Sequence, residues 1–342
     1  MYILNTLFFL NSEMSWKNHI YFMIIALLTI TNVVKAQDPG FSQVYSNQLY
    51  LNPAYVGNPF YMRAKLVYRN QWLTTRSPYT TYGVSFDRYF INANSGLGVN
   101  IVNDRQGQGS LNRLAADIVY SYTIQVTYDL QLRGGIQAGG ILKSLNTSNL
   151  IFPDMIDPTG EIIGSPDFSG YSKIVPDFAA GIAGEWDIFY GGISVHHLAQ
   201  PVESKYGQQR VVLPRKYTAH FGCDINIYKR YLFRKNLYIS PNILYLQQQD
   251  FRQINVGLYL SNHFFSAGFW LRENLTLASH TFVFLAGYHN DEYTVGYSYD
   301  FSIFKGGFRG INTSTHEVTF GKNFQYKARV RKKIRYIKSP KI

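Results

Sequence analysis

Cysteine is almost absent from this chain, since Cys223 is the only one among 342 residues. A single thiol cannot form an internal disulfide, and it lies too far into the chain for lipoprotein acylation. Cysteine-based zinc and redox frameworks are likewise excluded. Charged residues are few, at 16%, and no apolar run reaches the roughly 20 residues that a membrane-spanning helix needs. Any membrane crossing therefore has to be made by strands.

Aromatic residues and glycine are plentiful, with 28 Tyr, 24 Phe and 28 Gly. Aromatic side chains suit pleated surfaces, and glycine relieves crowding where strands bend, so the composition favours a β-rich protein. A secreted β-sandwich is the competing fold. It is disfavoured because a sandwich has little use for the many regular segments described below.

The N-terminus has the pattern of a secretory signal. Lys17 precedes an apolar run over 20–34, and Val34-Lys35-Ala36 supplies small residues at the two positions that a signal peptidase reads, which predicts cleavage after Ala36. The alternative is a membrane anchor helix, but about 15 apolar residues fall short of a bilayer span. Met14 is a plausible true start, because residues 1–13 place a second apolar run ahead of the charged region.

From Tyr61 onward, polar and apolar residues alternate in segment after segment. In the first segment, Leu66 and Tyr68 share one face, whereas Arg63, Lys65 and Arg69 share the other. Period-two alternation indicates strands with two unlike faces, one suited to lipid and the other to water. The inward charges, among them Arg133, Lys143, Lys216 and Asp224, are expected to pair or to line a channel.

The alternation predicts an all-β fold, a transmembrane antiparallel β-barrel of about 14 strands spanning residues 61–326. The expected strands are 61–71, 79–90, 96–103, 113–126, 129–144, 176–186, 188–198, 215–227, 237–247, 252–261, 263–272, 279–289, 292–302 and 315–326. An even number suits a bacterial single-chain barrel. Aromatic girdles at the membrane interfaces are expected from Tyr68, Trp72, Tyr89, Phe90, Tyr288, Tyr293 and Phe324.

The gaps between these strands are unequal in a regular way. With a periplasmic N-terminus, the long gaps 145–175, 199–214 and 303–314 all fall on the outer side, and short turns fall on the periplasmic side. This asymmetry is typical of outer-membrane barrels. The sequence therefore predicts a protein in the outer membrane of a Gram-negative bacterium.

The stretch 37–60 lies between the signal and the first strand. Its Pro, Gly and Asn content disfavours a helix, yet Phe41, Tyr45, Tyr50, Leu51 and Tyr55 give it more apolar surface than a linker needs. We expect this segment to dock on or in the barrel, either as a plug or as a grip for a partner.

Several segments of the chain resemble the PorP/SprF family of outer-membrane proteins from the type IX secretion and gliding systems of Bacteroidetes. They are QDPGFSQVYSNQLYLNPAYVGN at 37–58, YRNQW at 68–72, PDFAAGIAGEWDIFYGGISVHHLAQP at 176–201, LPRKYTAHFG at 213–222, GYSYDFS at 296–302 and THEVTF at 315–320. The plug or partner candidates in the first of these are Asp38, Pro39, Phe41, Ser42, Gln43, Tyr45, Leu51, Asn52 and Pro53.

The resemblance implies a non-enzymatic barrel that supports secretion or surface attachment of a cargo such as a large adhesin. The implied partners are outer-membrane lipid, type IX secretion components and a secreted cargo protein. The alternative is a passive pore or transporter for small solutes, since many barrels of this size conduct.

The resemblance does not extend to residues 327–342, which add eight Lys or Arg and no acid. This tail is either a disordered solubilising end or a contact for anionic headgroups or an acidic partner. Nucleic-acid binding is improbable for an exported barrel. The periplasmic contact candidates are Lys229, Arg230, Arg234, Lys235, Arg331, Lys332 and Lys333, and the outer-loop candidates are Lys305, Phe308 and Arg309.

The histidines do not form a recognisable catalytic or metal-binding pattern. Ser194, His196 and His197 are close in sequence, but adjacent residues on a strand face opposite sides, so the two histidines are not expected to serve one site. The remaining histidines lack metal-ligand spacing. The sequence therefore predicts no catalytic residue, no metal site and no cofactor.

Overall fold

The computed structural model describes residues 38–57, 61–73, 75, 77–107, 110–147, 151, 155–157, 161, 170–206, 209–227, 237–276, 279–304 and 314–325. The chain divides into two compact units between Asp38 and Pro39, and the second unit contains all the described strands. The predicted signal peptide and basic tail lie outside the described residues.

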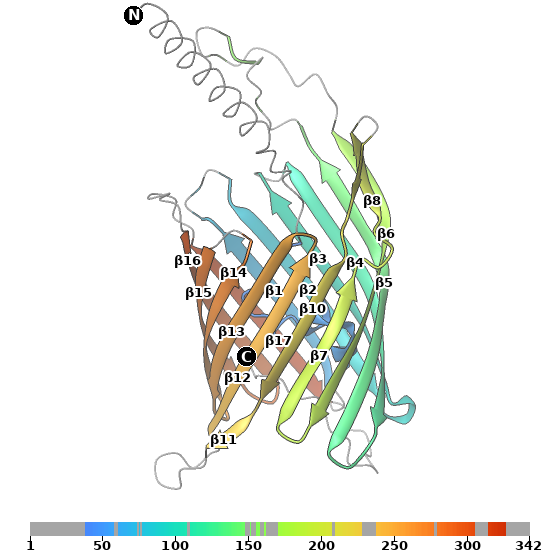
Figure 1. The fold of residues 1–342 in the computed structure, drawn as a ribbon, viewed down its shortest axis with the longest axis vertical. Helices are drawn as coiled ribbons and strands as arrows, with labels where there is room; N and C mark the ends of the chain where they lie inside the picture. Colours follow the sequence, from blue (N-terminus) through green and yellow to red (C-terminus); the bar gives the residue numbers. More distant parts are fainter. Residues whose placement is uncertain are drawn as a thin grey trace, which may run out of the picture. The chain divides into compact units, whose positions relative to one another are not determined.

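Long antiparallel strands dominate this unit (Figure 1). They are β1 (Tyr61–Gln71), β2 (Tyr79–Phe90), β3 (Ser95–Gln106), β4 (Leu111–Gln125), β5 (Leu130–Leu145), β6 (Tyr171–Trp186), β7 (Phe189–His196), β8 (Val202–Tyr206), β9 (Gln209–Val212), β10 (Lys216–Cys223), β11 (Ile225–Ile227), β12 (Leu237–Gln248), β13 (Phe251–Ser261), β14 (Phe265–Asn274), β15 (Ser279–His289), β16 (Tyr293–Phe304) and β17 (Thr315–Gln325). Three short helices accompany them: α2 (Gln48–Leu51), η1 (Pro53–Tyr55) and η2 (Ile91–Ala93).

The strands close into a barrel. Neighbours in sequence pair from β1 to β7 and from β11 to β17, β1 pairs with β17, and β10 pairs with both β7 and β12, while β8 and β9 form a separate two-stranded sheet. The 15-stranded sheet counts β10 and β11 separately, although both pair with β12 and only Asp224 separates them. Taken as one interrupted strand, they leave fourteen strands in the ring, which confirms the predicted fold class. Closure leaves no edge strand, whose backbone N–H and C=O groups would find no hydrogen-bond partner in lipid.

The two faces of the wall differ as the alternation predicts. On β1, Leu66 and Tyr68 are 50% and 42% exposed, whereas Arg63 and Arg69 on the other face are 9% and 5% exposed. Lipid takes the place of water around the apolar outer face of such a barrel. Tyr89 departs from the prediction, because it is buried on the inner face with the Arg133 guanidinium 5.5 Å from its ring centroid, and so it is not a girdle residue.

The structure differs from the expected strands mainly around β6 to β11. Strand β6 starts at Tyr171, five residues before its predicted start, and β7 ends at His196. The predicted gap after β7 contains the hairpin of β8 and β9. Asp224 interrupts the next strand, where its carboxylate accepts a hydrogen bond of 2.6 Å from the Ser240 hydroxyl. Local side-chain contacts of this kind have no signature in a period-two pattern.

The long connections 146–170, 197–215 and 305–314 follow β5, β7 and β16, so they share one end of the barrel. At the opposite end, short connections such as 91–94, 187–188 and 290–292 join the strands. This is the asymmetry that the sequence predicts. No helix in the described part of the chain is long and apolar enough to cross a membrane.

The main apolar core lies inside the barrel and is built around residues 38–57. Tyr45, Leu51, Ala54 and Tyr55 pack with inner-wall side chains in one buried cluster. Its wall members are Ala183, Tyr190, Leu244, Tyr259, Trp270, Val283 and Leu285. The blue segment in Figure 1, which carries α2 and η1, therefore packs within the ring of strands.

Charge on the outer face should destabilise the barrel according to depth. Ile136 lies midway along β5 and is 61% exposed, whereas Ile174 lies near the long-loop end of β6 and is 75% exposed. We expect Ile136→Arg to lower the free energy of unfolding in lipid vesicles by about 2–4 kcal/mol, and the control Ile174→Arg by about 0–1 kcal/mol. Urea titration followed by tryptophan fluorescence measures both. Equal losses would contradict the assigned lipid-facing surface.

Candidate functional site

Residues 38–57, hereafter the N-terminal segment, bind the inner wall through backbone and side-chain contacts. Asn52 shows why this sequence turns as it does. Its Oδ1 accepts a hydrogen bond from Ala54 N at 2.9 Å, and Pro53, which has no N–H, occupies the first position of η1. Its Nδ2 donates to the carbonyl oxygens of Ile182 and Ile193, each at 3.1 Å. One buried side chain therefore caps a turn and fastens it to β6 and β7.

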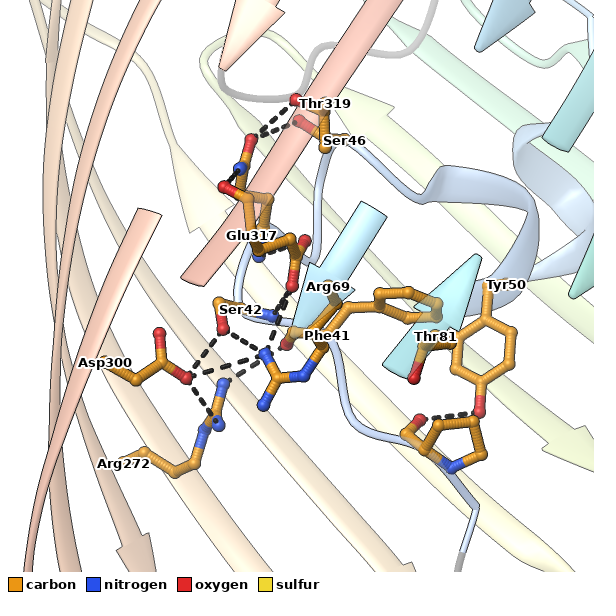
Figure 2. Close-up of polar contacts among 12 residues, drawn as sticks. Phe41, Ser42, Ser46, Tyr50, Arg69, Thr81, Arg272, Asp300, Glu317 and Thr319 are labelled. Carbon is orange, nitrogen blue, oxygen red and sulfur yellow. Dashed lines mark hydrogen bonds and ion pairs between the residues drawn. The ribbon is translucent and has the colours of Figure 1, made fainter. Parts of the chain in front are cut away.

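Glu317 on β17 holds the beginning of the segment. Its carboxylate accepts hydrogen bonds from Ser42 N at 2.7 Å and from Gln43 N at 3.1 Å. The Gln43 amide donates to the Glu317 carbonyl at 3.0 Å and accepts from the Thr319 hydroxyl at 2.7 Å. Figure 2 shows these contacts converging on fully buried Glu317. A carboxylate that accepts two backbone N–H groups is a charge-assisted anchor.

Two arginines balance the two acids around Ser42 (Figure 2). Arg69 Nη1 lies 3.2 Å from Glu317 Oε2 and 3.6 Å from Asp300 Oδ2, and it also contacts the Ser42 hydroxyl. Arg272 lies 3.5 Å from Asp300 and donates to the Phe41 carbonyl at 3.2 Å. The Ser42 hydroxyl donates to Asp300 at 2.6 Å. Buried charges are tolerated only when they are paired in this way.

The end of the segment is fixed by a second charged group. Asp87 accepts from Gly57 N at 2.8 Å and pairs with Arg63 through two contacts of 2.9 Å. Arg63 also donates to the Gln48 side chain at 2.7 Å. Arg133 donates to the Gly57 carbonyl at 2.8 Å. The segment is therefore anchored at both ends to different parts of the wall.

Aromatic rings fill the space between the two anchors. Tyr45 meets Tyr190 and Tyr259 edge-on, each with ring centroids 6.3 Å apart, and the Tyr55 hydroxyl lies 2.8 Å from His220 Nε2. Edge-to-face packing of this kind is favourable beyond the area it buries. Burial raises the pKa of the Tyr45 and Tyr55 phenols, so both rings stay neutral.

Glycines on the inner wall allow the N-terminal segment to approach the wall closely. A Cβ added to Gly135 would lie 2.3 Å from Ala54 N, and one added to Gly181 would lie 2.1 Å from Asn52 Oδ1. Contacts this short do not occur in folded proteins, so both positions require glycine while the segment is bound. A Cβ added to Gly134, which faces outward, would have no other heavy atom within 4 Å.

The structure brings most of the predicted N-terminal candidates together. Phe41 packs on Val67 and Val102, and the Pro39 carbonyl accepts a 2.8 Å hydrogen bond from the Tyr50 hydroxyl. Ser42, Gln43, Tyr45, Leu51, Asn52 and Pro53 are all buried. The candidates Lys229, Arg230, Arg234, Lys235, Lys305, Phe308, Arg309, Arg331, Lys332 and Lys333 lie outside the described residues.

Sequence reasoning did not single out the residues that receive the segment. These residues are the inward-facing charged side chains Glu317, Asp300, Arg272 and Asp87. Their inward positions in alternating strands were the only feature of the sequence that could have indicated them. Their pairing depends on contacts between residues as many as 275 positions apart.

The expectation that His196 and His197 face opposite sides is wrong. Strand β7 ends at His196, and His197 has a φ of 57°, so strand alternation does not apply to it. Both imidazoles are buried, with ring centroids 6.3 Å apart. His197 Nδ1 lies 2.9 Å from Asp177 Oδ2, which ties the end of β7 to β6.

Residues 33–321 match the family described as the type IX secretion system membrane protein PorP/SprF. The chain belongs to the PorP/SprF family. This match and the closed barrel place the protein in the outer membrane as a membrane protein of the type IX secretion system.

Solved structures similar to this PorP/SprF chain are outer-membrane proteins. An Acinetobacter baumannii outer membrane protein is 9% identical, with 78% of this chain and 100% of that chain covered and a TM-score of 0.45. A mutant of the TodX monoaromatic hydrocarbon channel is 11% identical over 81% and 94%, with a TM-score of 0.45. The KdgM porin is 6% identical over 77% and 99%, with a TM-score of 0.36. No curated protein matches the chain.

Removing the Glu317 carboxylate should loosen the N-terminal segment. Glu317→Ala leaves Arg69 without its nearest anion and two backbone N–H groups without acceptors, so we expect the free energy of unfolding to fall by about 3–5 kcal/mol. The control is Glu292→Ala in an exposed turn, where the loss should stay within about 0.5 kcal/mol. Urea unfolding in lipid vesicles measures both. Equal losses would show that the anchor contributes nothing to stability.

Proposed function

We propose that this protein is a non-enzymatic platform of the type IX secretion system whose lumen is closed by the N-terminal segment. The observation that carries the proposal is the anchoring of the segment at both ends, by Glu317 at its start and Asp87 at its end. A segment held by paired buried charges is a permanent part of the fold. It therefore suits a structural plug better than a partner grip.

One hollow between the N-terminal segment and the wall is very small. A hollow among Phe41, Tyr50, Lys65 and Val67 has a volume of about 10 Å³. This is about the smallest volume that holds one water molecule. Passage of solutes would require the segment to leave, which argues against the alternative of a passive pore.

The connection after β7 adds a second cover towards the long-loop end. Leu213 is buried against Ile141 and Val175 on the inner wall. Glu203 accepts a 2.7 Å contact from Lys143 Nζ, and Lys173 donates to the Val202 carbonyl. The chain therefore folds inward over β5 and β6 here.

The closed barrel would serve as a fixed base for contacts at its two ends. We propose that the long connections 146–170, 197–215 and 305–314 meet a secreted cargo such as an adhesin, with Lys305, Phe308 and Arg309 as contact residues. The basic residues Lys229, Arg230, Arg234, Lys235, Arg331, Lys332 and Lys333 would meet periplasmic secretion components. Outer-membrane lipid would surround the wall.

Catalysis has no place in this proposal. The lumen histidines are engaged in contacts that hold the fold, His197 with Asp177 and His220 with Tyr55. Among the residues that the structure describes, no group of three or more His, Cys, Asp or Glu side chains is arranged to hold a metal ion.

The closed lumen predicts low conductance in planar bilayers. We expect little steady current from the wild type and a stable open channel from Gly135→Val, because the added side chain collides with the segment at Ala54. Gly134→Val is the matched control, since Gly134 is adjacent but faces open space. Heat-modifiable gel migration checks that each variant is folded. Porin-like current from the wild type, unchanged by Gly135→Val, would support the pore instead.

The platform role predicts specific partners. Affinity purification of the protein from crosslinked outer membranes, followed by mass spectrometry, should recover type IX secretion components and a secreted cargo. Deleting the gene should remove that cargo from the cell surface while uptake of small solutes stays unchanged. Recovery of neither a secretion component nor a cargo protein would contradict the proposal.

A further inference from the structure

Two aspartates face each other across a glycine on the inner wall. Asp117 on β4 is directly opposite Gly139 on β5, and Gly139 is directly opposite Asp177 on β6. Strands in a sheet are about 4.8 Å apart, so the two aspartate backbones are about 10 Å apart. A Cβ added to Gly139 would lie 2.3 Å from Asp117 Oδ1. The Asp117 carboxylate therefore leans over the glycine, towards Asp177.

Three oxygen atoms in this place have no hydrogen-bond donor among the described residues. They are Asp117 Oδ1, Asp177 Oδ1 and Gln137 Oε1. The three residues are 5%, 3% and 7% exposed, so solvent does not replace the missing donors. A side-chain hydrogen bond joins the Gln137 amide to the Asp117 carboxylate, so the amide lies beside that carboxylate. Buried carboxylate oxygens without partners are costly and call for a specific explanation.

The nearby cationic side chains contact other oxygen atoms, although Arg113 and His197 also attract the Asp117 carboxylate electrostatically. Lys143 Nζ lies 2.7 Å from Glu203 Oε2, and Arg113 Nε lies 4.0 Å from Glu203 Oε1. His197 contacts Asp177 through Oδ2 and leaves Oδ1 without a donor. None of these cationic groups is a hydrogen-bond partner of Asp117 Oδ1 or Asp177 Oδ1.

We propose that Asp117, Asp177 and Gln137 form a binding site for a divalent cation of the calcium type. Calcium prefers carboxylate and amide oxygens, takes six to eight ligands in flexible geometry, and completes its shell with water. The two carboxylates would balance the positive charge of the cation. Gly139 has no side chain and so lets the Asp117 carboxylate lie over it. The ion would bridge β4 and β6 across β5, next to the strands β5 and β6 that the connection 146–170 joins.

Calcium binding to the purified, folded full-length chain in detergent micelles tests this site. After chelator treatment, calorimetric titration with calcium chloride should show one ion per chain. The thermal unfolding midpoint should rise with calcium. Asp117→Asn and Asp177→Asn should each weaken binding by about tenfold or more, because each removes one of two charged ligands. Asp104→Asn is the control, since Asp104 is equally buried but is occupied by Thr81 and Gln106.

Stability without calcium separates an ion site from a merely structural pair. In chelator, Asp117→Asn should unfold at a higher temperature than the wild type, because the substitution removes repulsion between two carboxylates. In calcium, that order should reverse. Absence of calcium binding by the wild type would overturn the proposal and assign the oxygens to ordered water or a shared proton. Binding that is equal in all variants would also overturn it.

Discussion

The fold depends on the pairing of charges inside a wall that faces lipid. Glu317 is fully buried, and its carboxylate is stabilised only because Arg69 and two backbone N–H groups of the N-terminal segment converge on it. Arg69, in turn, shares Asp300 with Arg272. Neither the barrel nor the segment supplies all the members of this network. The segment is therefore as much a part of the folded state as the strands.

This dependence explains where the core is. A membrane barrel presents its apolar face outward, so its inner face is polar and cannot form an ordinary hydrophobic core. Here the segment brings Tyr45, Leu51 and Tyr55 into the lumen. They pack against Tyr190, Tyr259 and Trp270 of the wall. Glycines on the wall leave room for its backbone. The segment therefore contributes apolar side chains that the polar inner face of the wall lacks.

Most of the architecture could be predicted from alternation because lipid contact imposes a period of two on every strand. Fourteen strands, a common end for the long connections and the inward position of Arg63 and Arg69 all follow from that period. Where local contacts override it, the prediction was wrong. Strand β7 stopped at His196, and Asp224 interrupted a strand to meet Ser240. Tyr89 was wrongly assigned to an interface girdle, although it shares the inner face of β2 with Asp87. Side-chain hydrogen bonds decide such places, and alternation does not record them.

By itself, the sequence determined the barrel, its strand number and its family. Each of these follows from periodicity, composition or a contiguous motif. Only the tertiary structure decided which inward charges meet, as Glu317 does with Ser42 and Asp87 with Gly57. It also decided that Asp117 and Asp177 lie opposite Gly139 on either side of β5. The reason is that closing a ring brings together residues that are remote in sequence, and their partners are set by strand register, to which no local pattern is sensitive.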